Sequence, residues 1–207
     1  NVKFGKSGSE YMIDKETNSI YKSVASIKYC NAQIADELYE LSKNHYNSFI
    51  ELIQDINTKT SLNSRQLEIL TGLDFFEQFG KNAYLLELIK LCNGVKEGQK
   101  TVRPALLTAK QLKKDKLESY GISEYLAQKY CEKETEKQYS KIDNVGLLTE
   151  LASRLENRAL NVVEQVKFEL TYLEYVIYTN PNINRQYYIV VDYKTYKEAR
   201  KPYCTLH

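Results

Sequence analysis

The sequence predicts a mainly α fold: a helix-hairpin-helix bundle with a further helical segment and a small terminal β element. Apolar residues recur at helical spacing from Val24 to about Leu91, and again from Val145 to Tyr175. The break at Thr179–Asn182 is followed by Tyr187–Asp192, the strongest strand signal of the chain. These observations predict helices first and a short β element last.

Composition limits the class of protein. The chain has 207 residues, 43% of them hydrophobic and 27% charged, as is ordinary for a soluble globular protein. A net charge of +2 is too small to indicate nucleic-acid binding by itself, so a binder needs locally clustered basic residues. The four scattered cysteines form no CxxC motif, which predicts reduced thiols and a cytoplasmic location. No apolar run approaches membrane-spanning length, so no membrane partner is expected.

Shifts in pattern divide the chain into four expected regions. Residues 1–92 form the helix-hairpin-helix region, and residues 93–144 form a linker with a charged helical segment. Residues 145–180 are expected to be helical, and residues 181–207 to begin a truncated β domain. The chain opens without Met and stops inside an apparent strand, so we expect it to be a piece of a larger protein.

The stretch from Val24 to Leu38 fits the frame of a hairpin between two helices. Val24 and Ile27 would lie on one face of a first helix, and the facing residues of the second would be Ile34, Ala35 and Leu38. Tyr29-Cys30-Asn31 stands where such hairpins usually have Gly-apolar-Gly. That turn lets backbone N–H groups approach a phosphate closely, and a helix N-terminus adds a favourable dipole. A plain helix–turn–helix packing element remains an alternative.

A second hairpin is expected shortly afterwards. Asn63 is a candidate N-cap with Gln66 in capping-box spacing, and Leu67–Leu73 resembles the front half of a hairpin. Two hairpins in tandem, flanked by Lys28 and Lys81, would follow two stretches of phosphate without reading bases. The alternative is a compact helical bundle whose apolar faces simply pack.

Catalytic motifs are missing from the sequence. There is no nucleophile elbow, phosphate-binding glycine loop or HExxH motif, and His45 and His207 stand far apart. The aspartates are isolated from one another in the sequence, so no local motif indicates a two-metal carboxylate site. We therefore expect no catalysis, no metal and no cofactor in this chain.

The order of motifs resembles the bacterial C-family replicative DNA polymerases, the polymerase III alpha subunits. Ile20–Lys28 is similar to their I-x-x-G-L-x-x-I-K-G-V-G segment, and Phe49–Asp55 to F-x-s-l-x-D-F. Leu62–Leu86 resembles l-N-k-R-x-L-e-x-L-i-x-x-G-A-F-D-x-l-G-x-x-R-x-x-L-l, and Glu169–Pro181 resembles E-x-e-x-L-G-x-x-x-t-x-h-P. The strand at Tyr187 would open the family's oligonucleotide-binding barrel.

This resemblance implies a DNA-replication protein, a nucleotidyltransferase, of which the chain is the non-catalytic part downstream of the fingers. Its implied partners are double-stranded DNA and the upstream palm and fingers domains, which hold the catalytic aspartates. The family's sliding-clamp motif has no match between Asn93 and Asn144, so clamp binding is unsupported. The alternative is a protein-interaction or scaffold module with degenerate hairpins that no longer bind DNA. The residues expected to contact the DNA backbone are Lys28, Tyr29, Asn31, Gln33, Lys81 and Asn82.

Overall fold

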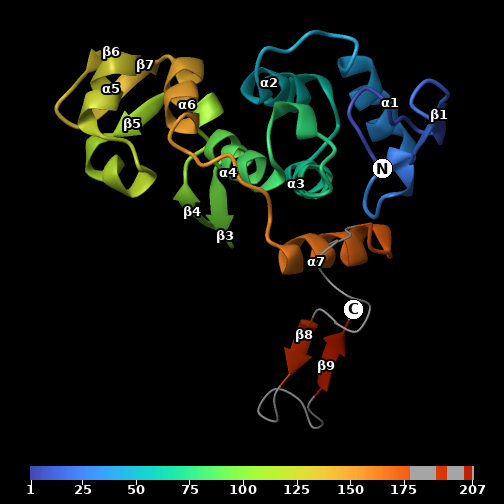
Figure 1. Cartoon of the computed structure of the whole chain (residues 1–207). Coiled ribbons are helices and arrows are strands. Elements are labelled where there is room, and N and C mark those ends of the chain that lie inside the picture. Colours follow the sequence, from blue (N-terminus) through green and yellow to red (C-terminus); the bar gives the residue numbers. More distant parts are fainter. Residues whose placement is uncertain (178–189, 195–202, 207) are drawn as a thin grey trace.

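The computed structural model describes residues 1–177, 190–194 and 203–206 (Figure 1). Helices form a large part of these residues, and small antiparallel sheets accompany them along the chain. The α-helices are α1 (Ala32–Leu41), α2 (Phe49–Lys59), α3 (Ser64–Gly72), α4 (Asn82–Asn93), α5 (Glu124–Tyr130), α6 (Asn144–Ala152) and α7 (Val162–Leu173). The short 3-10 helices are η1 (Val24–Ser26), η2 (Glu77–Phe79), η3 (Leu106–Thr108), η4 (Lys114–Lys116) and η5 (Glu118–Tyr120).

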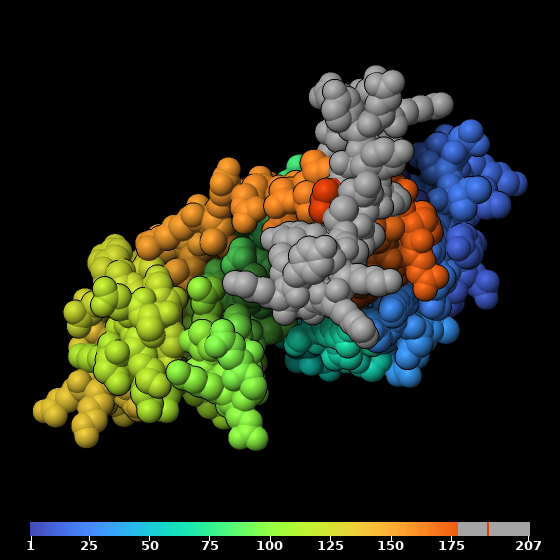
Figure 2. Space-filling view, turned by 90° about the horizontal axis from the view of Figure 1, so that it is seen from below, coloured from blue at the N-terminus to red at the C-terminus, as the bar shows by residue number. Residues whose placement is uncertain are grey.

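The strands pair only with antiparallel neighbours, in sheets of two or three strands. They are β1 (Met12–Asp14), β2 (Ser19–Tyr21), β3 (Val95–Glu97), β4 (Lys100–Arg103), β5 (Gln111–Lys113), β6 (Cys131–Glu134), β7 (Gln138–Ile142), β8 (Val190–Lys194) and β9 (Tyr203–Leu206). The chain is therefore a mixed α and β structure, in which β structure is more widespread than the sequence predicts. The N-terminal hairpin and α1 lie at one end, and α5 with its sheet lies at the other (Figures 1 and 2).

Helices α1 to α3 begin at side chains that cap their first backbone N–H groups. Asn31, Ser48 and Asn63 each accept a hydrogen bond from the backbone N–H three residues on. Asn63 and Gln66 form the predicted capping box, since the Gln66 side chain also accepts from the Asn63 N–H at 2.9 Å. The chain therefore specifies where these helices start through residues that are visible in the sequence.

One apolar core joins the first four helices, and the expected stripes of α1, α2 and α3 face it. Burying such side chains supplies about 1.5–3 kcal/mol each, so this core is the main source of stability. The buried stripe residues include Ile34, Leu38 and Leu41 in α1, Phe49, Leu52, Ile53 and Ile56 in α2, and Leu67 and Leu70 in α3. Phe4 and Phe75 also belong to this core, and their ring centroids lie 5.9 Å apart in an edge-on arrangement.

The segment expected to be the first helix of the hairpin is only a 3-10 turn, η1. Ser23 Oγ accepts from Ala25 N–H at 3.1 Å, and Ser26 Oγ donates to the Ser23 carbonyl at 2.7 Å. Such local hydrogen bonds compete with α-helix formation. Val24 and Ile27 are nevertheless fully buried, as the hairpin frame predicts.

Residues 93–144, where a linker and a charged helical segment are expected, contain the short strands β3 to β7 together with the short helix α5. A β3–β4 hairpin is followed by a sheet in the order β5-β7-β6, with α5 between β5 and β6 in the chain. Leu112 and Tyr139 pair across β5 and β7 and are buried, whereas the other side chains of these strands are exposed or half-buried. Lys141 and Glu132 pair on the solvent side, at 3.3 Å.

Helix α7 packs against α3 and runs below it in Figure 1. It begins with a capping box formed by Asn161 and Glu164. The Phe168 ring covers Gly72, where an added Cβ would lie 2.3 Å from Phe168 Cε1. In the terminal region, β8 pairs with β9; the first residues of the strand expected from Tyr187 lie outside the described residues.

Candidate nucleic-acid interface

The turn between η1 and α1 has the tight shape that the sequence predicts at Tyr29–Asn31. Cys30 N–H donates to the Ile27 carbonyl at 3.0 Å, and Tyr29 has φ +72°. This left-handed conformation costs a residue with a Cβ roughly 1–2 kcal/mol, which glycine would not pay. A strained residue persists only where its surroundings hold it, and such residues are common at functional sites.

Three contacts hold Tyr29 in place. Gln66 Nε2 donates to the Tyr29 carbonyl at 2.7 Å, and the Arg65 guanidinium lies 3.9 Å from the Tyr29 ring centroid. Tyr172 of α7 meets the same ring edge-on at 6.4 Å. The first residues of α3 and the last turn of α7 thus fix the turn, although Tyr29 itself stays 47% exposed.

Several backbone N–H groups of this turn are available to bind an anion. Those of Tyr29, Asn31, Ala32 and Gln33 have no hydrogen-bond acceptor among the described residues. The Asn31 side chain caps α1 by accepting from Ile34 N–H at 2.9 Å, so only its backbone is available. Successive free N–H groups at a helix start, with the helix dipole behind them, form a binding site for phosphate oxygens.

Charges around the turn favour the same ligand. Lys28 and Arg65 are exposed and have no carboxylate within ion-pair distance among the described residues. The Gln33 side chain, in contrast, is engaged: Nε2 donates to Glu37 Oε1 at 2.8 Å. Glu37 also accepts from Ser61 N–H at 2.6 Å, and this bond lowers the pKa of the Glu37 carboxyl. Glu37 is therefore turned toward α3 rather than toward the open amides.

The second turn, between α3 and α4, is closed by the chain itself. Lys81 N–H donates to Asn157 Oδ1 at 2.9 Å, and Tyr84 N–H donates to the Arg158 carbonyl. Asn82, expected to contact DNA, is 2% exposed; its Nδ2 donates to Gln165 Oε1 at 2.8 Å and its Oδ1 accepts from Leu160 N–H. The side chain of Asn82 is thus a structural bridge to α7, whereas the Lys81 side chain is exposed at this turn.

The structure also brings in residues that the sequence pattern did not single out. Arg65 and Tyr172 belong to the Tyr29 cluster through tertiary contacts, and their local patterns are those of an ordinary helix surface. Burial raises the pKa of the Cys30 thiol to about 11, so this turn presents no thiolate at neutral pH. What the turn offers chemically is binding through N–H donors and cations.

No protein-family model, curated protein or solved structure matches this chain. In the part of the chain that the structure describes, no three His, Cys, Asp or Glu side chains come together in a way that could hold a metal ion. Within the same ranges, no helix has the length and apolar character needed to cross a membrane.

Proposed function

We propose that this chain is the non-catalytic, duplex-binding part of a DNA-replication protein like the polymerase III alpha subunit. Its backbone N–H groups and cations at the turn between η1 and α1 bind the phosphates of the duplex. The observation that supports this most is the left-handed Tyr29, beside four backbone N–H groups that have no acceptor, and two cations that have no carboxylate partner, in the part of the chain that the structure describes. Contacts of this kind give affinity and orientation without base recognition.

Only one of the two hairpins takes part in this proposal. The N–H groups of Lys81 and Tyr84 at the start of α4 donate to Asn157 and Arg158, so the tandem arrangement reduces to a single open turn. The closed turn between α3 and α4 supports the alternative function, a scaffold module, because its polar groups bond to residues 157–160 of the chain itself. A titration with duplex DNA at low salt separates the two functions, because a scaffold module would show no binding.

Lys28→Ala is expected to flatten the salt dependence of duplex binding, whereas Lys81→Ala is expected to leave it unchanged. Each phosphate contact contributes about 0.9 to the slope of log K against log salt. Both lysines are exposed; Lys28 immediately precedes the Tyr29 turn and Lys81 is the N-cap residue of α4, so Lys81 is a control of the same residue type at the other turn. Fluorescence anisotropy with a labelled duplex at four or five salt concentrations measures both slopes. Equal slopes for Lys28→Ala and the unaltered chain would contradict the role of Lys28.

Ala32→Pro is expected to weaken duplex binding about tenfold without changing the salt slope. Ala32 is the first residue of α1, where proline fits the helix and removes only an N–H group. Asn31 before it is already extended, at φ −143° and ψ 174°, as a residue preceding proline must be. The change thus deletes one donor to phosphate and no charge. Thermal unfolding checks that α1 is intact; unaltered affinity with intact folding would argue against amide recognition.

A further inference from the structure

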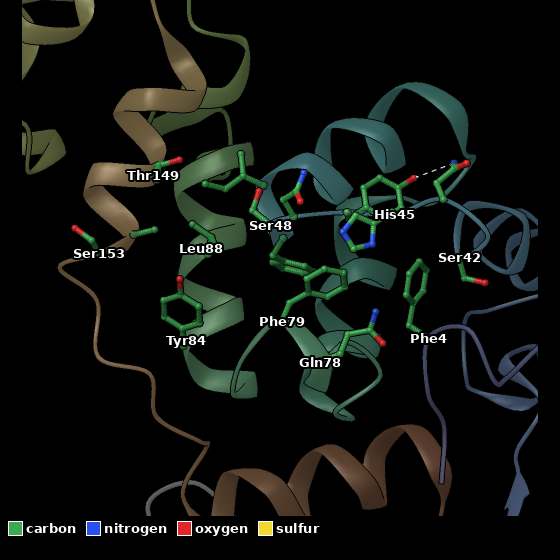
Figure 3. Close-up of a pocket in the computed structure, with 16 residues that line it drawn as sticks. Phe4, Ser42, His45, Ser48, Gln78, Phe79, Tyr84, Leu88, Thr149 and Ser153 are labelled. Carbon is green, nitrogen blue, oxygen red and sulfur yellow. Dashed lines mark hydrogen bonds between the residues drawn. The ribbon is translucent and has the colours of Figure 1, made fainter. Parts of the chain in front are cut away.

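A cavity of about 590 Å³ lies away from the Tyr29 turn, between the loop before α2, η2, α4 and α6 (Figure 3). This volume is in the range of pockets that enclose small organic molecules. Its wall comes from segments far apart in the chain, including Phe4 near the N-terminus and Ser153 after α6. The fold therefore assembles this hollow from at least five separate segments.

Aromatic rings form much of the cavity wall. Phe79 of η2 lies 5.7 Å from the Phe49 ring and 6.3 Å from the Phe4 ring, centroid to centroid. Figure 3 shows His45 and Gln78 close to Phe79, with Tyr84 across the cavity from them. Walls of this kind favour a flat aromatic ligand, which gains stacking and edge contacts together with burial.

Three polar groups at the cavity have no hydrogen-bond partner among the described residues: the exposed side chains of His45 and Gln78, and the hydroxyl of the half-buried Tyr84. Other polar groups of the wall are engaged; Tyr46 Oη, for example, donates to Asp55 Oδ2 at 2.9 Å. Partial burial raises the pKa of the Tyr84 phenol, so it stays a neutral donor near pH 7. The cavity thus keeps an imidazole, an amide and a phenol for a ligand with several donors and acceptors.

The absence of charged side chains from the cavity wall restricts the class of ligand that fits. No Lys, Arg, Asp or Glu is among the residues that line the cavity, and His45 is the one histidine among them. A nucleoside triphosphate would need several cations, and a metal complex would need carboxylates. Neither class fits, whereas an uncharged ring does.

We propose that this cavity binds a neutral nucleobase, presented as a free base or nucleoside. The ring would lie against Phe79 and Tyr84, and the Gln78 amide would pair with its edge. A carboxamide can donate to and accept from one base edge at the same time, as Asn and Gln do with adenine. This site is separate from the Tyr29 turn and does not depend on duplex binding.

Adenosine is the probe, because it has a base and no phosphate for the amides of the Tyr29 turn. In a ¹⁵N-labelled sample, it is expected to shift the amide signals of residues 45–50 and 78–80 and to leave residues 29–33 unmoved. Gln78→Leu is expected to weaken the measured Kd about tenfold, the loss of a base-edge hydrogen-bond pair. Gln54→Leu is the matched control: Gln54 is exposed, and its side chain has no hydrogen bond to any described residue.

Two results would overturn this proposal. One is the absence of shifts at residues 45–50 and 78–80 at millimolar adenosine in a protein whose spectrum is folded. The other is binding that Gln78→Leu and Tyr84→Phe both leave unchanged. Either result leaves the duplex titrations of Lys28 and Ala32 variants unaffected, so the failure of one site is distinct from the failure of the other.

Discussion

Gly72→Ala is expected to destabilise the protein by about 2 kcal/mol, the typical effect of overpacking a close contact. Gly72 ends α3 under the ring of Phe168, and the added Cβ would lie 2.3 Å and 2.4 Å from two ring carbons. Alanine is intrinsically the better helix residue, so any loss of stability comes from the contact with α7. Chemical denaturation at pH 7 measures the change.

The matched control is Gly8→Ala. Gly8 is also buried, but its nearest atom to an added Cβ is a Tyr39 ring carbon at 4.0 Å, an ordinary contact. Phe168→Ala in the Gly72→Ala background should remove the clash and give a favourable coupling in a double-mutant cycle. Strictly additive effects of the two substitutions would mean that this contact does not limit packing.

Asp74→Asn is expected to stabilise the protein at pH 7 by about 1–2 kcal/mol. Burial, with help from the nearby Glu77 and Glu169 carboxylates and against the pull of Lys81, raises the pKa of the Asp74 carboxyl from 3.8 to about 6. A shift of this size is worth at most about 3 kcal/mol, and partial exposure reduces it. Asp74 also has φ +62°, a conformation that Asn tolerates well.

The sign of the pH dependence follows from the raised pKa. At a pH well below the ordinary value of 3.8, the Asp74 carboxyl is protonated in both the folded and the unfolded chain, so it does not lower the free energy of unfolding. As pH rises from about 4 to 6, the unfolded chain releases this proton while the folded chain retains it, so the free energy of unfolding falls. The difference between Asp74→Asn and the unaltered chain should therefore be smallest near pH 4 and largest above pH 6. Denaturation curves at both pH values test this, and a difference that is constant with pH would contradict it.

Local patterns in the sequence predict those parts of the fold that depend on local interactions. The Asn63–Gln66 capping box needs only residues three apart, and the stripes of α1 and α2 need only a repeat of 3.6. Strands β5 and β7 are harder to recognise because each has a single buried residue, Leu112 or Tyr139, among polar neighbours. β5 has one apolar residue, and β7 has two, Tyr139 and Ile142, that stand three positions apart, so neither strand shows an apolar alternation.

In the candidate site, too, local sequence predicts some features, whereas others depend on contacts between distant segments. The bend at Tyr29 follows from a sequence frame, whereas the burial of Asn82 depends on Gln165, 83 residues away. Arg65 lies on the Tyr29 ring only because α3 is packed beside the turn. Distances of this kind arise from tertiary packing, which a single sequence without relatives does not reveal.

Helix α7 is attached to both turns: Lys28 N–H donates to the Tyr172 carbonyl at 3.2 Å, and Asn82 Nδ2 to Gln165 at the other end. Undocking this helix must break both attachments, so the two turns are coupled in local unfolding. The Lys28 amide can exchange with deuterated solvent only after its acceptor has moved away, whereas the neighbouring Tyr29 amide has no such protection. The exchange rate at that single position therefore reports how often α7 leaves the rest of the molecule.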